Sequence, residues 1–67
     1  MPKEIFLLEL WKKYAEKAEE IRVKRYDDYV KLKARLRKYL YTIKLPPDLA
    51  EKVINEYKGK GKSIVEF

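Results

Sequence analysis

IRVKRYDDYVKLKARL, residues 21–36, is the stretch of sequence that decides the fold. Apolar residues recur in it at alternate positions, first at Ile21 and Val23 and then from Val30 to Leu36. On a helix this spacing would scatter the apolar side chains around the axis, whereas on a strand it places them on one face. The stretch therefore predicts two strands joined by a turn, and it argues against one helix that continues through residues 20–45.

The turn of this hairpin is expected at Asp27 and Asp28, because aspartate tolerates turn geometry better than most residues. In that register Val23 lies opposite Leu32, so one face of the hairpin is apolar. The other face is basic and carries Arg22, Lys24, Lys31, Lys33, Arg35 and Arg37. A register that separates the two kinds of side chain supports the pairing.

Residues 37–45 break the alternation, because Tyr39, Leu40 and Tyr41 follow one another. Two explanations are open. Either a bulge near Arg37 and Lys38 shifts the phase of the strand, or this end of the strand is covered on both faces.

Two helices are expected outside the hairpin. Over residues 3–19 the apolar side chains recur at helical spacing, which predicts an amphipathic helix with Pro2 at a first helical position. Pro46 and Pro47 start a second helix, and Gly59 is expected to end it in the left-handed conformation.

The last residues complete the fold. Residues 58–62 read as a mobile basic loop and residues 63–67 as a short final strand. The prediction is one domain over residues 1–67, an α+β fold with a small, mainly antiparallel three-stranded sheet and two helices in the order α-β-β-α-β.

Composition limits what this chain can do. Its 67 residues allow one modest core and leave no room for a substrate pocket on a separate scaffold. Cysteine and histidine are absent, which excludes disulfides and Cys/His zinc sites and removes the commonest acid–base and nucleophilic residues. We therefore expect that the chain is not an enzyme and has no catalytic residue, metal, cofactor or small-molecule substrate.

The expected location follows from hydropathy. No apolar run approaches the roughly 20 residues that cross a bilayer, and Met1 to Glu4 lacks the layout of a secretory signal. A cytoplasmic protein with no membrane partner is expected. Abundant Lys and Glu, with no Gln, favour a thermophilic source.

The positive charge is concentrated in the hairpin region. The chain has 17 basic and 11 acidic residues, and residues 21–45 hold nine of the basic and two of the acidic ones. This distribution favours a polyanionic partner, and Tyr26 and Tyr29 fall on the basic face, where a ring can stack on an unpaired base. The candidate RNA-binding residues are Arg22, Lys24, Arg25, Tyr26, Tyr29, Lys31, Lys33, Arg35, Arg37, Lys38, Lys60 and Lys62. The alternative is a solvated sheet face.

Several stretches resemble one known family. They are Met1-Pro2-Lys3-Glu4-Ile5, Phe6-Leu7-Leu8, Ile21-Arg22-Val23-Lys24, Val30 to Arg35 followed by Arg37-Lys38-Tyr39-Leu40-Tyr41-Thr42, and Ala50-Glu51-Lys52. In order and spacing they are similar to the eukaryotic and archaeal ribosomal protein L-thirty-eight-e family. Two departures are Pro46-Pro47-Asp48, where the family has a Thr-Asp turn, and the loop 59–62.

The resemblance implies a structural constituent of the large ribosomal subunit, with an α+β fold and basic strand residues on ribosomal RNA phosphates. Neighbouring ribosomal proteins are further expected partners. On helical RNA, phosphate contacts, shape and 2′-hydroxyl contacts should outweigh base reading.

Two other classes of function compete with this interpretation. Residues 42–53 look like the strand and first helix of ribbon–helix–helix DNA-binding regulators, but too few residues follow to form the second helix of that dimer. The other alternative is an accessory protein that binds a protein partner, with the basic face serving solubility.

Overall fold

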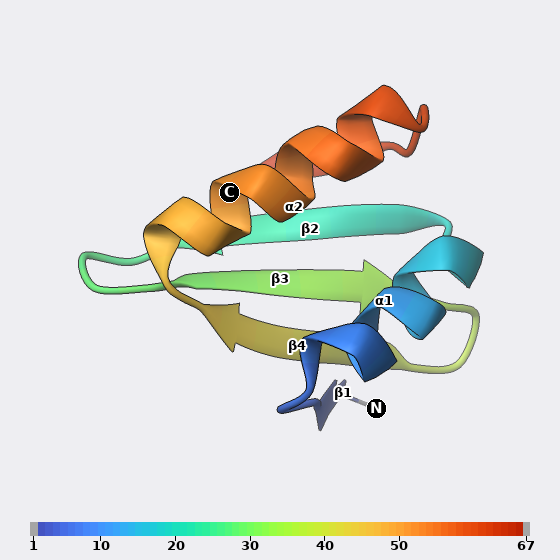
Figure 1. Cartoon of the computed structure of the whole chain (residues 1–67). Coiled ribbons are helices and arrows are strands. Elements are labelled where there is room, and N and C mark those ends of the chain that lie inside the picture. Colours follow the sequence, from blue (N-terminus) through green and yellow to red (C-terminus); the bar gives the residue numbers. More distant parts are fainter. Residues whose placement is uncertain (1, 67) are drawn as a thin grey trace.

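The computed structural model describes residues 2–66, and their fold is α+β, as the sequence predicts. The elements are β1 (Pro2–Glu4), α1 (Leu8–Lys17), β2 (Glu20–Arg25), β3 (Val30–Arg35), β4 (Leu40–Leu45), α2 (Pro47–Gly59) and β5 (Ile64–Glu66). The strands form one five-stranded sheet in the order β1-β4-β3-β2-β5. Figure 1 shows this sheet with the two helices packed along it.

The first hairpin has the predicted register. Val23 pairs with Leu32 across β2 and β3, and the amide of Tyr26 donates to the carbonyl of Tyr29 at 2.9 Å. The two aspartates therefore form the tight loop expected of them. Pairing in this register puts the apolar residues of both strands on the face that the helices cover.

The break in alternation over residues 37–45 is neither a bulge nor a doubly covered strand. It is a second hairpin, in which the amide of Leu36 donates to the carbonyl of Tyr39 at 2.9 Å around Arg37 and Lys38. Ala34 then pairs with Tyr41, so buried positions are even-numbered in β3 and odd-numbered in β4. A two-residue loop changes the parity in this way without interrupting either strand.

The predicted sheet of three strands is wrong, because residues 2–66 form a sheet of five strands in which two of the pairings are parallel. Residues 2–4, which the prediction put at the start of the first helix, form β1 beside β4, and the amide of Ile5 donates to the carbonyl of Thr42 at 2.7 Å. The order is therefore β-α-β-β-β-α-β and the sheet is mixed. Pro2 suits an edge strand as well as a helix start, so it could not distinguish them.

The other edge of the sheet is β5, which pairs in parallel with β2. It lies within the predicted final strand, of which Phe67 is outside the described residues. The helix before it ends at Gly59, but the residue with a left-handed backbone is Gly61, at φ +80°. The turn therefore closes two residues later than predicted.

The core lies between the sheet and the two helices. Trp11 is fully buried, donates from its indole Nε1 to the carbonyl of Tyr41 at 2.9 Å and meets the ring of Tyr57 edge-on at 6.0 Å. This one side chain joins α1 to β4 and to α2. Every buried residue of β2, β3 and β4 points to the same side, which leaves the other face of the sheet without a helix.

Candidate RNA-binding surface

The face of the sheet opposite the helices carries most of the predicted site. It bears the alternate residues of β2, β3 and β4 that do not enter the core. We call six of them the basic face: Arg22, Lys24, Lys31, Lys33, Arg35 and Lys44. One acidic residue of β2 belongs to the same face, Glu20, which accepts a hydrogen bond from Arg22 Nε at 2.8 Å. The separation of charge that the sequence indicates is therefore present in the fold.

Three lysines form one row across the basic face. Lys24 pairs with Lys31 across the first hairpin, and Lys31 pairs with Lys44 across the second. None of the three forms an ion pair within residues 2–66. Like charges directly opposite on a ladder destabilise it, so this row favours a bound anion.

The row lies beside the two tyrosines of the first loop. Tyr26 and Tyr29 stack on each other with ring centroids 4.6 Å apart. The lysine ammonium groups lie close to these rings, Lys44 at 4.2 Å from the centroid of Tyr29, and Lys24 and Lys31 at 5.6 and 5.8 Å from that of Tyr26. These cation–π contacts orient the lysines on the basic face. The two rings therefore hold the lysine ammonium groups in place, a role separate from the base stacking that the sequence suggests for them.

Arg37 and Lys38 lie at the opposite end of the face, where both are exposed on the loop between β3 and β4. With Arg35 they border a shallow hollow of about 230 Å³. Figure 1 shows the loops on either side of β3 at opposite ends of the sheet. Basic residues therefore extend along the whole length of β3.

Arg25 does not join the basic face. Its partner in the sheet is Val30, on the helix side, and its guanidinium donates to Glu51 of α2 and to Glu66 of β5, each at 2.5 Å. Arg25 thus connects three elements of the fold. This predicted RNA-binding residue therefore lies apart from the basic face, because a strand end lets a long side chain reach the carboxylates of neighbouring elements.

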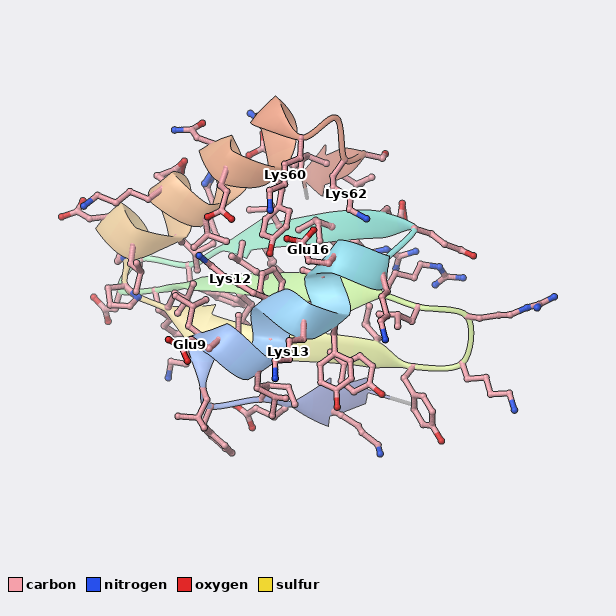
Figure 2. All side chains as sticks on the ribbon, turned by 45° about the vertical axis from the view of Figure 1, so that its right-hand side comes forward. Glu9, Lys12, Lys13, Glu16, Lys60 and Lys62 are labelled. Atoms are coloured by element: carbon pink, nitrogen blue, oxygen red, sulfur yellow. The ribbon has the colours of Figure 1, made fainter. Side chains whose placement is uncertain are left out.

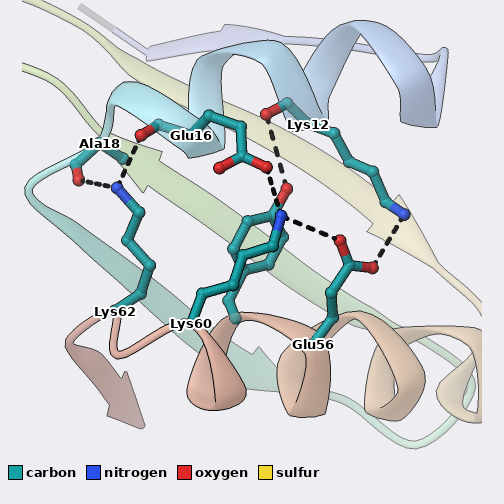
Figure 3. A network of polar contacts seen from close by, with 7 residues as sticks. Lys12, Glu16, Ala18, Glu56, Lys60 and Lys62 are labelled. Carbon is teal, nitrogen blue, oxygen red and sulfur yellow. Dashed lines mark hydrogen bonds and ion pairs between the residues drawn. The ribbon is translucent and has the colours of Figure 1, made fainter.

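Lys60 and Lys62 are also on the helix side, where Figures 2 and 3 show them pointing toward α1. Lys60 Nζ is 2.5 Å from Glu16 Oε1 and 3.5 Å from Glu56 Oε2. Lys62 Nζ donates to the carbonyls of Glu16 and Ala18 at 2.8 and 2.9 Å, at the C-terminal end of α1, where the helix dipole favours a cation. The predicted mobile basic loop is therefore bound to α1.

The charges of this cluster shift the pKa values of its members. The hydrogen bond from Lys12, at 3.0 Å, is the main cause that lowers the pKa of Glu56 below its ordinary value. The hydrogen bond to Glu16 is the main cause that raises the pKa of Lys60. Burial, in turn, raises the pKa of Tyr57. These ion pairs connect α1 with α2 and with Lys60 on the helix side, and they involve no residue of the basic face.

Sequence reasoning missed two cations of this region. Lys44 completes the lysine row, and Lys3 of β1 lies with its Nζ 4.7 Å from the ring centroid of Tyr39. Lys44 was detectable, because a second two-residue loop at Arg37 and Lys38 would have placed it opposite Lys31. No local pattern could have shown that Lys3 lies beside β4.

Neither of the two helices within residues 2–66 is long and apolar enough to span a membrane.

Comparison with known proteins supports the resemblance seen in the sequence. No family model matches the chain. The large ribosomal subunit protein eL38 of Aeropyrum pernix is 46% identical over 67 residues, which is the whole of both chains. Identity of this extent, with no part of either chain left over, shows common descent. The chain belongs to the family of large ribosomal subunit protein eL38.

Proposed function

We propose that this chain, a structural constituent of the large ribosomal subunit and not an enzyme, binds ribosomal RNA through its basic face. The observation that supports the proposal best is the row of Lys24, Lys31 and Lys44, three cations side by side with no carboxylate paired to any of them within residues 2–66. In the free protein this row is unfavourable, and RNA phosphates would relieve it.

The mechanism of binding is electrostatic and geometric. Lysine and arginine ammonium and guanidinium groups on the basic face neutralise phosphates, and the release of counterions drives association. A stiff sheet held by two hairpins keeps these groups at fixed spacing, which suits the regular backbone of an RNA helix better than it suits base reading. Binding of this kind needs no cofactor and no small-molecule substrate, and a ribosomal constituent of this kind acts in the cytoplasm.

The test is replacement of Lys33 and Arg35 with alanine in one variant. Both residues lie in the middle strand of the basic face and outside the core, so the fold should remain intact. Binding to large-subunit RNA should weaken, and the slope of log Kobs against log salt should fall by about 1.5–2 for two lost phosphate contacts. The matched control is replacement of Lys52 and Lys58 of α2 with alanine, which removes the same charge from exposed positions on the helix side. Equal affinity of the two variants would show that the basic face is not the RNA-binding surface.

The repressor alternative conflicts with the sheet. In that class of regulator the strand before the helix pairs with the same strand of a second copy. Here that strand is β4, and it has β3 on one edge and β1 on the other. β1 pairs with Leu40, Tyr41 and Thr42, so within residues 2–66 only the last three residues of β4 keep an unpaired edge, which is short for pairing with a second copy.

A second surface, at the start of α1, favours contact with a protein partner. Phe6 and Leu7 are 83% and 69% exposed, and a hollow of about 380 Å³ beside them is lined by Leu7, Leu8, Glu9, Leu10 and Lys13. Exposed apolar groups gathered in this way are typical of protein contacts. The proposed partner at this position is a neighbouring ribosomal protein, in addition to RNA on the basic face.

A further inference from the structure

A second feature of the open face lies between the basic face and the β1 edge. A polar hollow of about 250 Å³ is lined by Lys3, Glu4, Lys31, Lys33 and Thr42. Its walls come from three adjacent strands, β1, β4 and β3. The hollow therefore adjoins the proposed RNA-binding residues but contains a carboxylate and a hydroxyl as well as cations.

Sheet register places the polar groups of the hollow in order. Glu4 pairs with Thr42 across β1 and β4, and Thr42 pairs with Lys33 across β4 and β3. The three side chains consequently point to the same side, in one row that runs from a carboxylate through a hydroxyl to an ammonium group. Lys31 lies on the same face two residues along the strand from Lys33. The ammonium group of Lys3 is instead held over the ring of Tyr39.

The carboxylate of Glu4 needs an explanation. It is exposed and forms no ion pair within residues 2–66, although Lys31 and Lys33 line the same hollow. On a surface that binds phosphates a negative charge costs affinity. It is favourable only where the ligand presents a hydrogen-bond donor to it.

The combination of groups narrows the ligand class. A divalent cation would be repelled by the lysines, and an isolated anion would be attracted by them but would offer no hydrogen-bond donor to the carboxylate of Glu4. A ribose–phosphate unit of RNA satisfies both ends, because its phosphate is anionic and its neighbouring 2′-hydroxyl donates a hydrogen bond. That hydroxyl is the group by which a protein distinguishes RNA from DNA.

We propose that this hollow seats one ribose–phosphate unit of the RNA backbone, with Lys31 and Lys33 at the phosphate and Glu4 accepting the hydrogen bond of the 2′-hydroxyl beside Thr42. The proposal rests on the proposed function and goes beyond it, since it assigns the selection of RNA over DNA to a single acceptor on β1. Phosphate neutralisation on the rest of the basic face does not depend on the sugar.

The experiment compares the binding of two single strands of about 12 nucleotides, one of RNA and one of DNA with the same bases and uracil in both, to the full chain at low salt. Fluorescence anisotropy gives the ratio of the two affinities for the wild type and for the Glu4→Ala and Glu4→Gln variants. Both substitutions remove the same charge, but glutamine keeps a carbonyl oxygen that accepts a hydrogen bond. Glu4→Gln is thus the matched control for charge.

The wild type should prefer RNA by about tenfold, the value of one hydrogen bond to a charged group. Glu4→Ala should bring the ratio close to one and Glu4→Gln should retain most of it, while both variants bind DNA more tightly than the wild type. An RNA preference that is the same in all three proteins, or its absence in the wild type, would overturn this assignment and leave RNA binding by the basic face intact. Failure of the wild type to bind both these strands and large-subunit RNA in a salt-sensitive way would instead refute the proposed function, and this inference with it.

Discussion

Replacement of Lys31 with glutamine should stabilise the free protein and weaken its binding to RNA. Lys31 is the middle of the lysine row, with Lys24 opposite it on one side and Lys44 on the other. Each like-charged pair costs roughly 0.2–1 kcal/mol, and the substitution removes both pairs. It also removes the contact of Lys31 with the ring of Tyr26, at 5.8 Å, which contributes about 0.5 kcal/mol. Taken at the middle of that range, the net gain in the free energy of unfolding should be about 0.7 kcal/mol.

Thermal and urea denaturation measure this gain directly. In a domain of this size it corresponds to a rise in Tm of about 3–6 °C at low salt. At about 1 M salt, where the Debye length is roughly 3 Å, the rise should disappear because the repulsion is already screened. In a titration with large-subunit RNA, the slope of log Kobs against log salt should fall by about 0.7–0.9, one phosphate contact.

Lys52→Gln is the control, since Lys52 is an exposed lysine of α2 on the other side of the sheet. It should change the free energy of unfolding by less than about 0.5 kcal/mol and leave the slope of log Kobs against log salt unchanged. A Lys31→Gln protein that is less stable than the wild type at low salt, and that retains the full salt slope, would refute the reasoning on both counts.

Three further predictions concern the rest of the molecule. Trp11→Phe should lower the free energy of unfolding by about 2–3 kcal/mol in urea denaturation, because it leaves the buried carbonyl of Tyr41 without its donor and opens a small cavity. Lys12 lowers the pKa of Glu56 in the folded state, so the stability from this pair is present at pH values above the ordinary pKa of 4.5 and is lost as the pH falls through the folded pKa. Glu56→Gln should therefore flatten the dependence of Tm on pH in that acidic range. An unchanged curve of Tm against pH would contradict this prediction. Phe6→Ser should leave the Tm unchanged but reduce retention on the large subunit in a high-salt sucrose gradient, whereas full retention would argue against a protein contact at this residue.

The first hairpin was predictable because its signals are local. Alternation from Ile21 to Leu36 and a pair of aspartates specify both the strands and their register, and the structure confirms the pairing of Val23 with Leu32. The second hairpin was missed because Arg37 and Lys38 are ordinary surface residues with no turn preference. The run of apolar residues after them then looked like a fault in one strand.

The fold brings some of the predicted RNA-binding residues together on one face and places others elsewhere. Lysines and arginines in the middle of β2 and β3 follow the parity of the strands, so their common face could be deduced. Arg25, Lys60 and Lys62 carry the same charge, but their partners are Glu51, Glu66 and Glu16, which are 26 to 46 positions away in the sequence. Charge alone does not distinguish a cation held in an ion pair from one available to a ligand.

The sequence by itself determined the family, the first hairpin with its register, and the concentration of positive charge on one face of it, because each depends on residues that are near neighbours along the chain. Only the tertiary structure decided that β1 and β5 extend the sheet in parallel at its two edges, and that Glu4 and Thr42 meet Lys33 in one row. Parallel pairing needs a long crossover, and which edge receives a short strand depends on where the helices pack against the core. The position of a short edge strand therefore depends on the free energy of the whole fold, and it cannot be read from any one segment of the sequence.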